Sequence, residues 1–190
     1  MNSRYATLGV AVSVLTASIA CADFNTFSWS LSENGLSGTN EFSLASTYDV
    51  LGSAAVGGSG TVDSTTMTVV GGNSNVRGMT WYSTTASADG VVSVDWAFLA
   101  QPGADIGGWD AGGYVLNGVF QALALNSNAP ASGVLSFSVS AGDVFGFGTA
   151  TADGQFGAST TTFTNFSFIP APGAIGLLAL AGLAGHRRRR

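Results

Sequence analysis

Residues 113–125 read Gly-Tyr-Val-Leu-Asn-Gly-Val-Phe-Gln-Ala-Leu-Ala-Leu, and this stretch indicates the fold class most clearly. Asn117-Gly118, at its centre, suits the positive φ angles of a tight hairpin turn. The segments on either side, 113–116 and 119–125, are apolar and have the length of strands. The stretch therefore predicts a β-hairpin.

The same logic extends outward along residues 23–169. Apolar residues alternate there with Ser, Thr and Asp at a period of two, and no helical period runs over a useful window. The alternating apolar positions are Phe27, Trp29 and Leu31; Val92, Val94, Trp96 and Phe98; Leu135, Phe137 and Val139; Phe145 and Phe147; and Phe163, Phe166 and Phe168. Turn signals separate them at Asn34-Gly35, Gly57-Gly58, Gly71-Gly72-Asn73, Asp89-Gly90, Gly142-Asp143 and Asp153-Gly154. We predict an all-β single domain, an antiparallel β-sandwich or jelly roll of about eight to ten short strands.

Charge and composition exclude several classes of function. All eleven acidic residues lie between Asp23 and Asp153, where Arg77 is the only basic residue, so this segment has a formal charge of −10. Such a body does not bind nucleic acid, because it cannot neutralise phosphates. It also contains no Cys, His or Lys. These absences exclude thiolate–imidazole zinc sites, Ser–His pairs and Schiff-base lysines.

The first 22 residues have the pattern of a secretory signal peptide. Arg4 precedes an apolar run that ends in Ala20-Cys21-Ala22, a small-x-small cleavage site. Cleavage is expected before Asp23, after export by a Sec-type machinery. An alternative is acylation of Cys21, although Ser18 stands where lipoprotein sites usually carry a branched apolar residue.

The C-terminal 21 residues, 170–190, have three parts. Pro170-Ala-Pro172-Gly173 is followed by a short apolar run, 174–185, and then by His186 and the arginines Arg187, Arg188, Arg189 and Arg190. As a helix the run would be about 18 Å long, which is short for a hydrocarbon core of about 30 Å. The arginines would keep this end cytoplasmic while the body faces outward. The combination predicts a removable sorting signal with a short transmembrane helix, and a plain tail anchor is the alternative.

This tripartite end resembles the PEP-CTERM sorting signal of exported bacterial proteins, with Ala171 in place of the glutamate that the family name implies. The resemblance implies processing by an exosortase-like membrane enzyme. The second half of the body, 91–168, also resembles a body type that recurs among such proteins, through Val94-Asp95-Trp96, 113–118 and Ala141-Gly-Asp143-Val-Phe-Gly-Phe147. That second resemblance implies an extracellular β-sandwich and no agreed activity.

Residues 101–113 form the most promising ligand-binding segment, because they are Gly-rich and acidic and contain Trp109. An exposed Trp109 could stack on a sugar ring, whereas a ring folded back would plug the end of the sandwich. The aspartates Asp105, Asp110, Asp143 and Asp153 are candidates for calcium ligands, and turn capping is the alternative interpretation.

Two further hypotheses concern charged residues. A glycosidase would need a pair of facing carboxylates, for which Glu33, Glu41 and Asp95 are the candidates, but no spacing places two of them together. Arg77 would bind an anion or, more simply, pair with a carboxylate.

Taken together, the two terminal signals and the composition of the body predict a non-catalytic protein of the cell surface or extracellular matrix, associated with exopolysaccharide or biofilm and needing no cofactor. A carbohydrate- or calcium-binding module is the first alternative, and a carboxylate-based glycosidase is the second.

Overall fold

The computed structural model describes residues 23–100 and 107–171. In these residues the chain forms β-strands and two 3-10 turns, η1 (Phe24–Thr26) and η2 (Asn126–Asn128), and the all-β prediction is confirmed. The strands are β1 (Ser30–Leu36), β2 (Thr47–Ser53), β3 (Ser59–Val62), β4 (Thr66–Val70), β5 (Gly78–Thr85), β6 (Gly90–Leu99), β7 (Asp110–Leu116), β8 (Val119–Leu125), β9 (Ala131–Val139), β10 (Val144–Thr151) and β11 (Thr160–Pro170).

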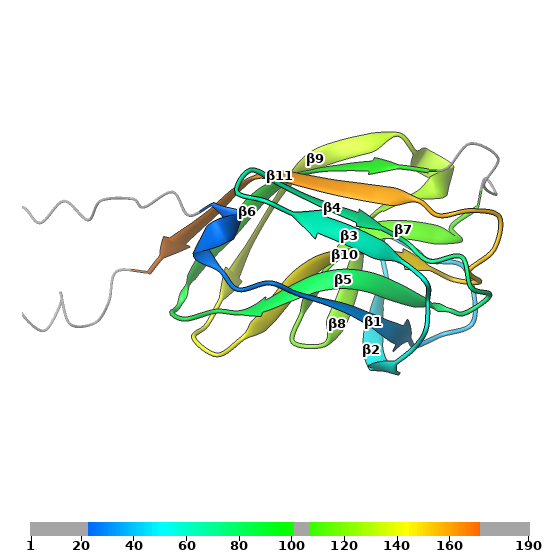
Figure 1. Cartoon of the computed structure of the whole chain (residues 1–190), viewed down its shortest axis with the longest axis horizontal. Helices are drawn as coiled ribbons and strands as arrows, with labels where there is room; N and C mark the ends of the chain where they lie inside the picture. Colours follow the sequence, from blue (N-terminus) through cyan, green and yellow to red (C-terminus); the bar gives the residue numbers. More distant parts are fainter. Residues whose placement is uncertain (1–22, 101–106, 172–190) are drawn as a thin grey trace, which may run out of the picture.

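The strands form two antiparallel sheets that pack on each other (Figure 1). Sheet A has the order β1-β2-β8-β7-β10-β5, and β5 pairs back to β1, so the sheet closes on itself. Sheet B is open, with the order β3-β4-β11-β6-β9. The predicted arrangement of two antiparallel layers is therefore confirmed, while the closure of one layer was not predicted.

Two hydrophobic clusters follow from this topology. The first lies between the sheets and is aromatic, with Phe145 and Phe147 from sheet A against Phe163, Phe166 and Phe168 from sheet B. The second is formed largely by residues of sheet A, and its members are Leu36, Phe42, Met79, Trp81, Ala111, Val115, Phe120, Ala122, Ala150 and Ala152. Sheet A therefore packs apolar side chains on both of its faces.

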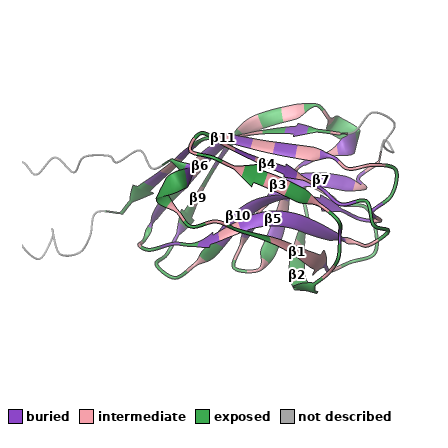
Figure 2. Cartoon of the chain, in the orientation of Figure 1, coloured by how far each residue is buried: buried purple, intermediate pink, exposed green. Residues whose placement is uncertain are grey.

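Strand β10 shows what this double packing requires. From Phe145 to Thr151 every residue of the strand is buried, and the strand is almost continuously purple in Figure 2. Phe145, Phe147, Thr149 and Thr151 alternate with small residues on the other face. A Cβ added to Gly146 would lie 2.7 Å from the Trp81 ring, so the second cluster has room only for hydrogen at this position. Small residues opposite large ones are the usual way to fill a narrow closed sheet.

The predicted hairpin is confirmed. Strands β7 and β8 pair across Asn117-Gly118, whose φ angles are 50° and 79°, as a tight turn of this type requires. The turn predicted at Asn34-Gly35 is wrong. Both residues lie within β1, where the Asn34 side chain accepts a hydrogen bond from Trp81 Nε1 at 2.8 Å and donates one to the Leu51 carbonyl at 3.1 Å.

Strand β11 explains the irregular spacing of Phe163, Phe166 and Phe168. The pairing of β11 with β6 shifts register between Thr164 and Ser167, and Asn165 within this bulge has a φ of 53°. The extra residue allows all three phenylalanines to reach the first cluster although the first two are three residues apart.

The sheet register defines two ends of the molecule. Val144, at the start of β10, pairs with Thr85, and nearby Phe27 packs on Phe168 with ring centroids 5.4 Å apart. The first and last described residues therefore lie at one end, which we call the terminal end (Figure 1). Thr151, at the other end of β10, pairs with Asp110 and marks the distal end. Within 23–100 and 107–171, no helix has the length and apolar character needed to cross a membrane. The predicted signal peptide and transmembrane helix fall outside these ranges.

Candidate functional site

The distal end contains a buried carboxylate, Asp110, which is the first residue of β7 and only 4% exposed. Its Oδ2 accepts a hydrogen bond of 2.6 Å from the hydroxyl of Ser159, the residue before β11. The hydroxyl of Thr151 also bonds to this carboxylate, and the Asp110 backbone N–H donates to Asn126 Oδ1 at 3.3 Å. Asp110 therefore links sheet A to the residue that precedes strand β11 of sheet B.

Burial raises the pKa of Asp110 above its ordinary value, and the negative charge of nearby Asp153 adds to this effect. The hydrogen bonds from Ser159 and Thr151 act in the opposite direction, because they stabilise the charged form. A buried carboxyl with a raised pKa is the kind of group that a general acid requires. No spacing in the sequence distinguished Asp110 in this respect from the other turn aspartates.

Trp109 is half-buried and packs against the second cluster. Its backbone carbonyl accepts a hydrogen bond of 2.6 Å from Ala152 N–H. The preceding residue, Gly108, donates its N–H to Glu41 Oε2 at 2.8 Å and accepts from Phe42 N–H at 2.6 Å. The ring thus belongs to the packing of the distal end, which favours the interpretation of a folded-back tryptophan over an exposed stacking platform.

Arg77 also lies at the distal end, immediately before β5. Its guanidinium donates to the carbonyls of Ser37 at 3.1 Å and Asn40 at 2.7 Å. The Cζ atom lies 4.6 Å from the centre of the Phe42 ring and 5.5 Å from that of Tyr48. The prediction that Arg77 pairs with a carboxylate is wrong within the described part of the chain. The hydrogen bonds of the guanidinium go to backbone carbonyls there. Arg77 instead closes the loop before β2 through backbone acceptors and aromatic faces.

The four calcium candidates do not meet in one site. Asp110 and Asp153 interact at the distal end, whereas Asp143 precedes β10 at the terminal end, about 26 Å away for a strand of this length. Asp143 accepts from Ser140 N–H at 2.7 Å and from Asn117 Nδ2 at 2.9 Å, which is turn capping. Asp105 falls outside the described residues. No group of three or more His, Cys, Asp or Glu side chains able to hold a metal is found within 23–100 and 107–171.

The glycosidase candidates each hold a piece of backbone or a side-chain amide. Glu33 Oε1 accepts from Gly58 N–H at 2.6 Å, and Glu41 binds Gly108 as described above. Asp95 Oδ2 accepts from Asn165 Nδ2 at 2.7 Å, which supports the bulge in β11. These three carboxylates are thus used in separate local contacts on β1, in the loop before β2 and on β6.

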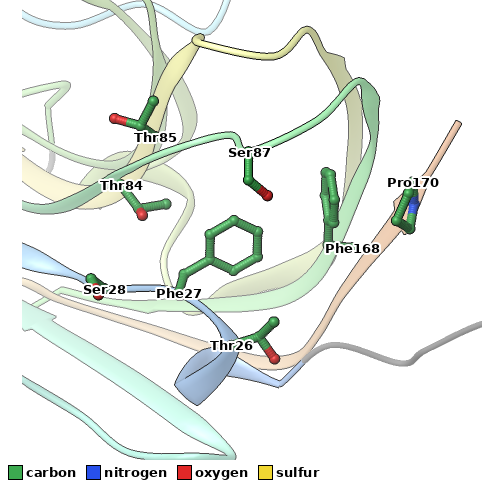
Figure 3. Close-up of a pocket in the computed structure, with 8 residues that line it drawn as sticks. All are labelled: Thr26, Phe27, Ser28, Thr84, Thr85, Ser87, Phe168 and Pro170. Atoms are coloured by element: carbon green, nitrogen blue, oxygen red, sulfur yellow. The ribbon is translucent and has the colours of Figure 1, made fainter. Parts of the chain in front are cut away.

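A groove of about 520 Å³ lies at the terminal end and was not predicted from the sequence (Figure 3). Its lining residues are Thr26, Phe27, Ser28, Thr84, Thr85, Ser87, Phe168 and Pro170. None of them is charged, so the lining combines hydroxyl groups with two phenyl rings and a proline. In Figure 3 the Phe27 ring projects into the space between Thr84 and Phe168.

Sequence reasoning missed this groove because its residues come from three distant segments, 26–28, 84–87 and 168–170. Serines and threonines in a β-protein are expected on outward faces, so the sequence did not distinguish the groove-lining serines and threonines from the others. The aromatic residues gave a partial signal, since Phe27 and Phe168 were both predicted to be strand residues facing the core. Pro170, assigned to the sorting signal, is the last residue of β11 and borders the groove, whereas the other sorting-signal residues and the cleavage site Ala20 and Ala22 lie outside the described part.

The chain was also compared with known proteins. No protein-family model matches it, and no significant match is found among curated proteins.

Proposed function

We propose that this chain is an exported, non-catalytic protein of the cell surface or extracellular matrix, trimmed at both ends by signal peptidase and an exosortase-like enzyme. The observation that carries the proposal is the pairing of an export signal at 1–22 with a proline motif, a short apolar run and four arginines at 170–190. Residue chemistry adds support, since the body between them contains no Cys, His or Lys.

The arrangement of the fold is compatible with such trimming. Phe27, near the expected N-terminus of the mature chain, packs on Phe168, two residues before the proline motif. Both expected cleavage points therefore adjoin the terminal end, and a chain held in the bilayer by its tail would present the distal end outward. The carboxylates of the body also fit a structural role, because Glu33, Glu41 and Asp95 each bind a neighbouring segment.

Replacing Arg187–Arg190 with serine tests the sorting step. With the arginines gone, the apolar run has no basic stop at its cytoplasmic end, so membrane retention and processing are expected to fail. Cell fractionation followed by immunoblotting should show wild-type protein at the surface and the variant either unprocessed or released at full length. Identical fractionation and identical mass for the two chains would contradict the proposal.

A second candidate function is binding of a neutral saccharide in the terminal groove. The specific observation is the uncharged lining of hydroxyls and phenyl rings, which can offer hydrogen bonds to sugar hydroxyls and an apolar surface to sugar C–H groups. The formal charge of −10 on the body disfavours acidic polysaccharides. This candidate gives the proposed matrix protein a direct contact with exopolysaccharide.

Affinity electrophoresis in gels that contain a neutral polysaccharide tests this candidate. Ser87→Trp should fill the groove and abolish retardation, whereas Ser53→Trp, an exposed position at the end of β2, should leave it unchanged. Trp109→Ala separates the two sites, because it removes binding only if the 101–113 segment is the sugar site. Wild-type protein that shows no retardation, or Ser87→Trp protein that remains retarded, would refute the groove as the binding site.

A further inference from the structure

The two sheets differ in how their edges are protected. Sheet A closes on itself and leaves no edge, whereas sheet B ends in β3 on one side and β9 on the other. β3 has four residues, while β9 has nine and pairs with β6 in unbroken register from Ala131 to Val139. In the part of the chain that the structure describes, no strand pairs with the other side of β9, and Figure 1 shows β9 at the margin of the molecule.

Strand β9 lacks the devices that usually block edge-to-edge pairing. Edge strands are commonly protected by charged side chains, proline, bulges or short length. The nine residues Ala-Ser-Gly-Val-Leu-Ser-Phe-Ser-Val include no charged residue and no proline, and Gly133 is the only glycine. Aspartates and glycines are the residues that a body with one arginine could use for this purpose, and β9 has almost none of them. Its outer edge therefore offers a regular row of backbone donors and acceptors.

The side chains of β9 also favour pairing. Ser132, Val134, Ser136 and Ser138 point outward and are exposed. Val134 is 71% exposed, the largest value among the exposed large apolar side chains of the described residues. Figure 2 shows the alternation of exposed and partly buried residues along this strand. An exposed β-branched residue on an open edge is suited to packing against a second strand.

We propose that two copies of this chain pair through β9, antiparallel and about a two-fold axis at Val134, so that two five-stranded sheets become one continuous sheet. This register sets Val134 against its own copy and Ser132 against Ser136, so no like charges are opposed across the new pair. A second copy fits better than a basic partner, because a basic partner would be attracted to the acidic surface and not to an uncharged strand.

The charge that lies in register with the proposed two-fold axis does not prevent this pairing. Asp95 lies opposite Val134 on β6, so the Asp95 residues of the two copies would be three strand spacings apart, about 14 Å. That distance exceeds the Debye length of about 8 Å at physiological ionic strength. The formal charge of −10 on each body still repels the other copy at low salt. Association through β9 should therefore strengthen as salt is added.

Sedimentation velocity of the folded, purified gene product tests the proposal. Because the experiment requires only folded protein, a negative result would refute the dimer and leave the proposed export intact. Dimer is expected to form with rising protein concentration and to increase between low and physiological salt. Val134→Lys should raise the dimer dissociation constant by about tenfold or more, because a lysine on the edge blocks strand addition. The matched control Thr61→Lys, on the other edge strand β3, should leave it unchanged. A monomer under all conditions, or a dimer that survives Val134→Lys, would overturn the proposal.

Disulfide trapping tests the register directly. Cys21 is the only cysteine, so a Cys21→Ser background gives clean single-cysteine variants. Directly opposed residues in an antiparallel pair lie within the Cα separation that a disulfide spans. Val134→Cys should form a covalent dimer under mild oxidation, and Thr61→Cys should not. Equal rates of cross-linking for the two variants would show that the contact is random and would refute the β9 interface.

Discussion

Two consecutive contacts between the same pair of strands have different chemistry. Phe147 of β10 packs on Phe163 of β11 with ring centroids 4.9 Å apart. Two residues further along each strand toward the distal end, Thr149 and Thr161 share a hydroxyl–hydroxyl hydrogen bond of 2.7 Å, and both are fully buried. The interior between the sheets thus changes from aromatic to polar halfway along β10.

The contrast shows two ways of joining two sheets. At the terminal end, buried rings contribute a large apolar area, and the burial of apolar area has no preferred direction. At the distal end, the Thr149–Thr161 bond, the bond from Thr149 to the Val69 carbonyl at 2.9 Å and the Asp110–Ser159 bond all have defined directions. We infer that the aromatic end supplies most of the stability and that the polar end fixes the relative position of the sheets.

Phe147→Ala should produce the largest effect. The Phe147 ring is fully buried among Phe145, Phe163 and Phe166, so its removal leaves a cavity between the sheets. The expected loss in the free energy of unfolding is about 3–5 kcal/mol, measured by urea denaturation. A loss below about 1 kcal/mol would show that the aromatic end does not dominate the stability.

Thr149→Val should be costly alone and nearly neutral in combination. The single change removes a donor to the Val69 carbonyl and leaves Thr161 with an unpaired hydroxyl, at an expected cost of about 1–3 kcal/mol. Adding Thr161→Val replaces the hydroxyl pair by an apolar pair of similar shape and should restore much of the stability. A double-mutant cycle in urea measures this coupling. Additive losses would mean that the two hydroxyls act independently.

Asp110→Asn and Asp143→Asn should change the pH dependence of stability in opposite directions. Because burial raises the pKa of Asp110 in the folded state, this group reduces stability as pH rises from the unfolded pKa, about 3.9, through the folded one. Hydrogen bonds from Ser140 and Asn117 lower the pKa of Asp143, so this group adds stability above about pH 4 that is lost on acidification. Urea unfolding between pH 3 and 7 should therefore show a steeper rise with pH for Asp110→Asn and a shallower one for Asp143→Asn. If the curves of both variants ran parallel to the wild-type curve, both assignments would be contradicted.

Local parts of the fold could be predicted from the sequence, because period-two alternation and Asn-Gly chemistry act over a few residues. The hairpin at Asn117-Gly118 is an example. Closure of sheet A was beyond such reasoning, because it depends on β5 returning to β1, about fifty residues earlier. The turn predicted at Asn34-Gly35 failed for the same reason, since a distant partner, Trp81, keeps Asn34 within a strand.

The candidate sites show a similar division. Asp110 and Trp109 could be selected from the composition of their segment, but the partner that makes Asp110 unusual, Ser159, is 49 residues away. The terminal groove required three segments to be brought together, and its Ser and Thr residues look like ordinary outward-facing positions. The open edge of β9 could be recognised only once the order of the strands was known.

Intact mass spectrometry of the protein recovered from the native cell envelope tests the central claim of export and double trimming most directly. The account predicts a chain that begins at Asp23 and lacks Arg187–Arg190, with any anchor attached near the terminal end. Recovery from the cytosol of the complete chain, with Met1 and Arg190 in place, would contradict it.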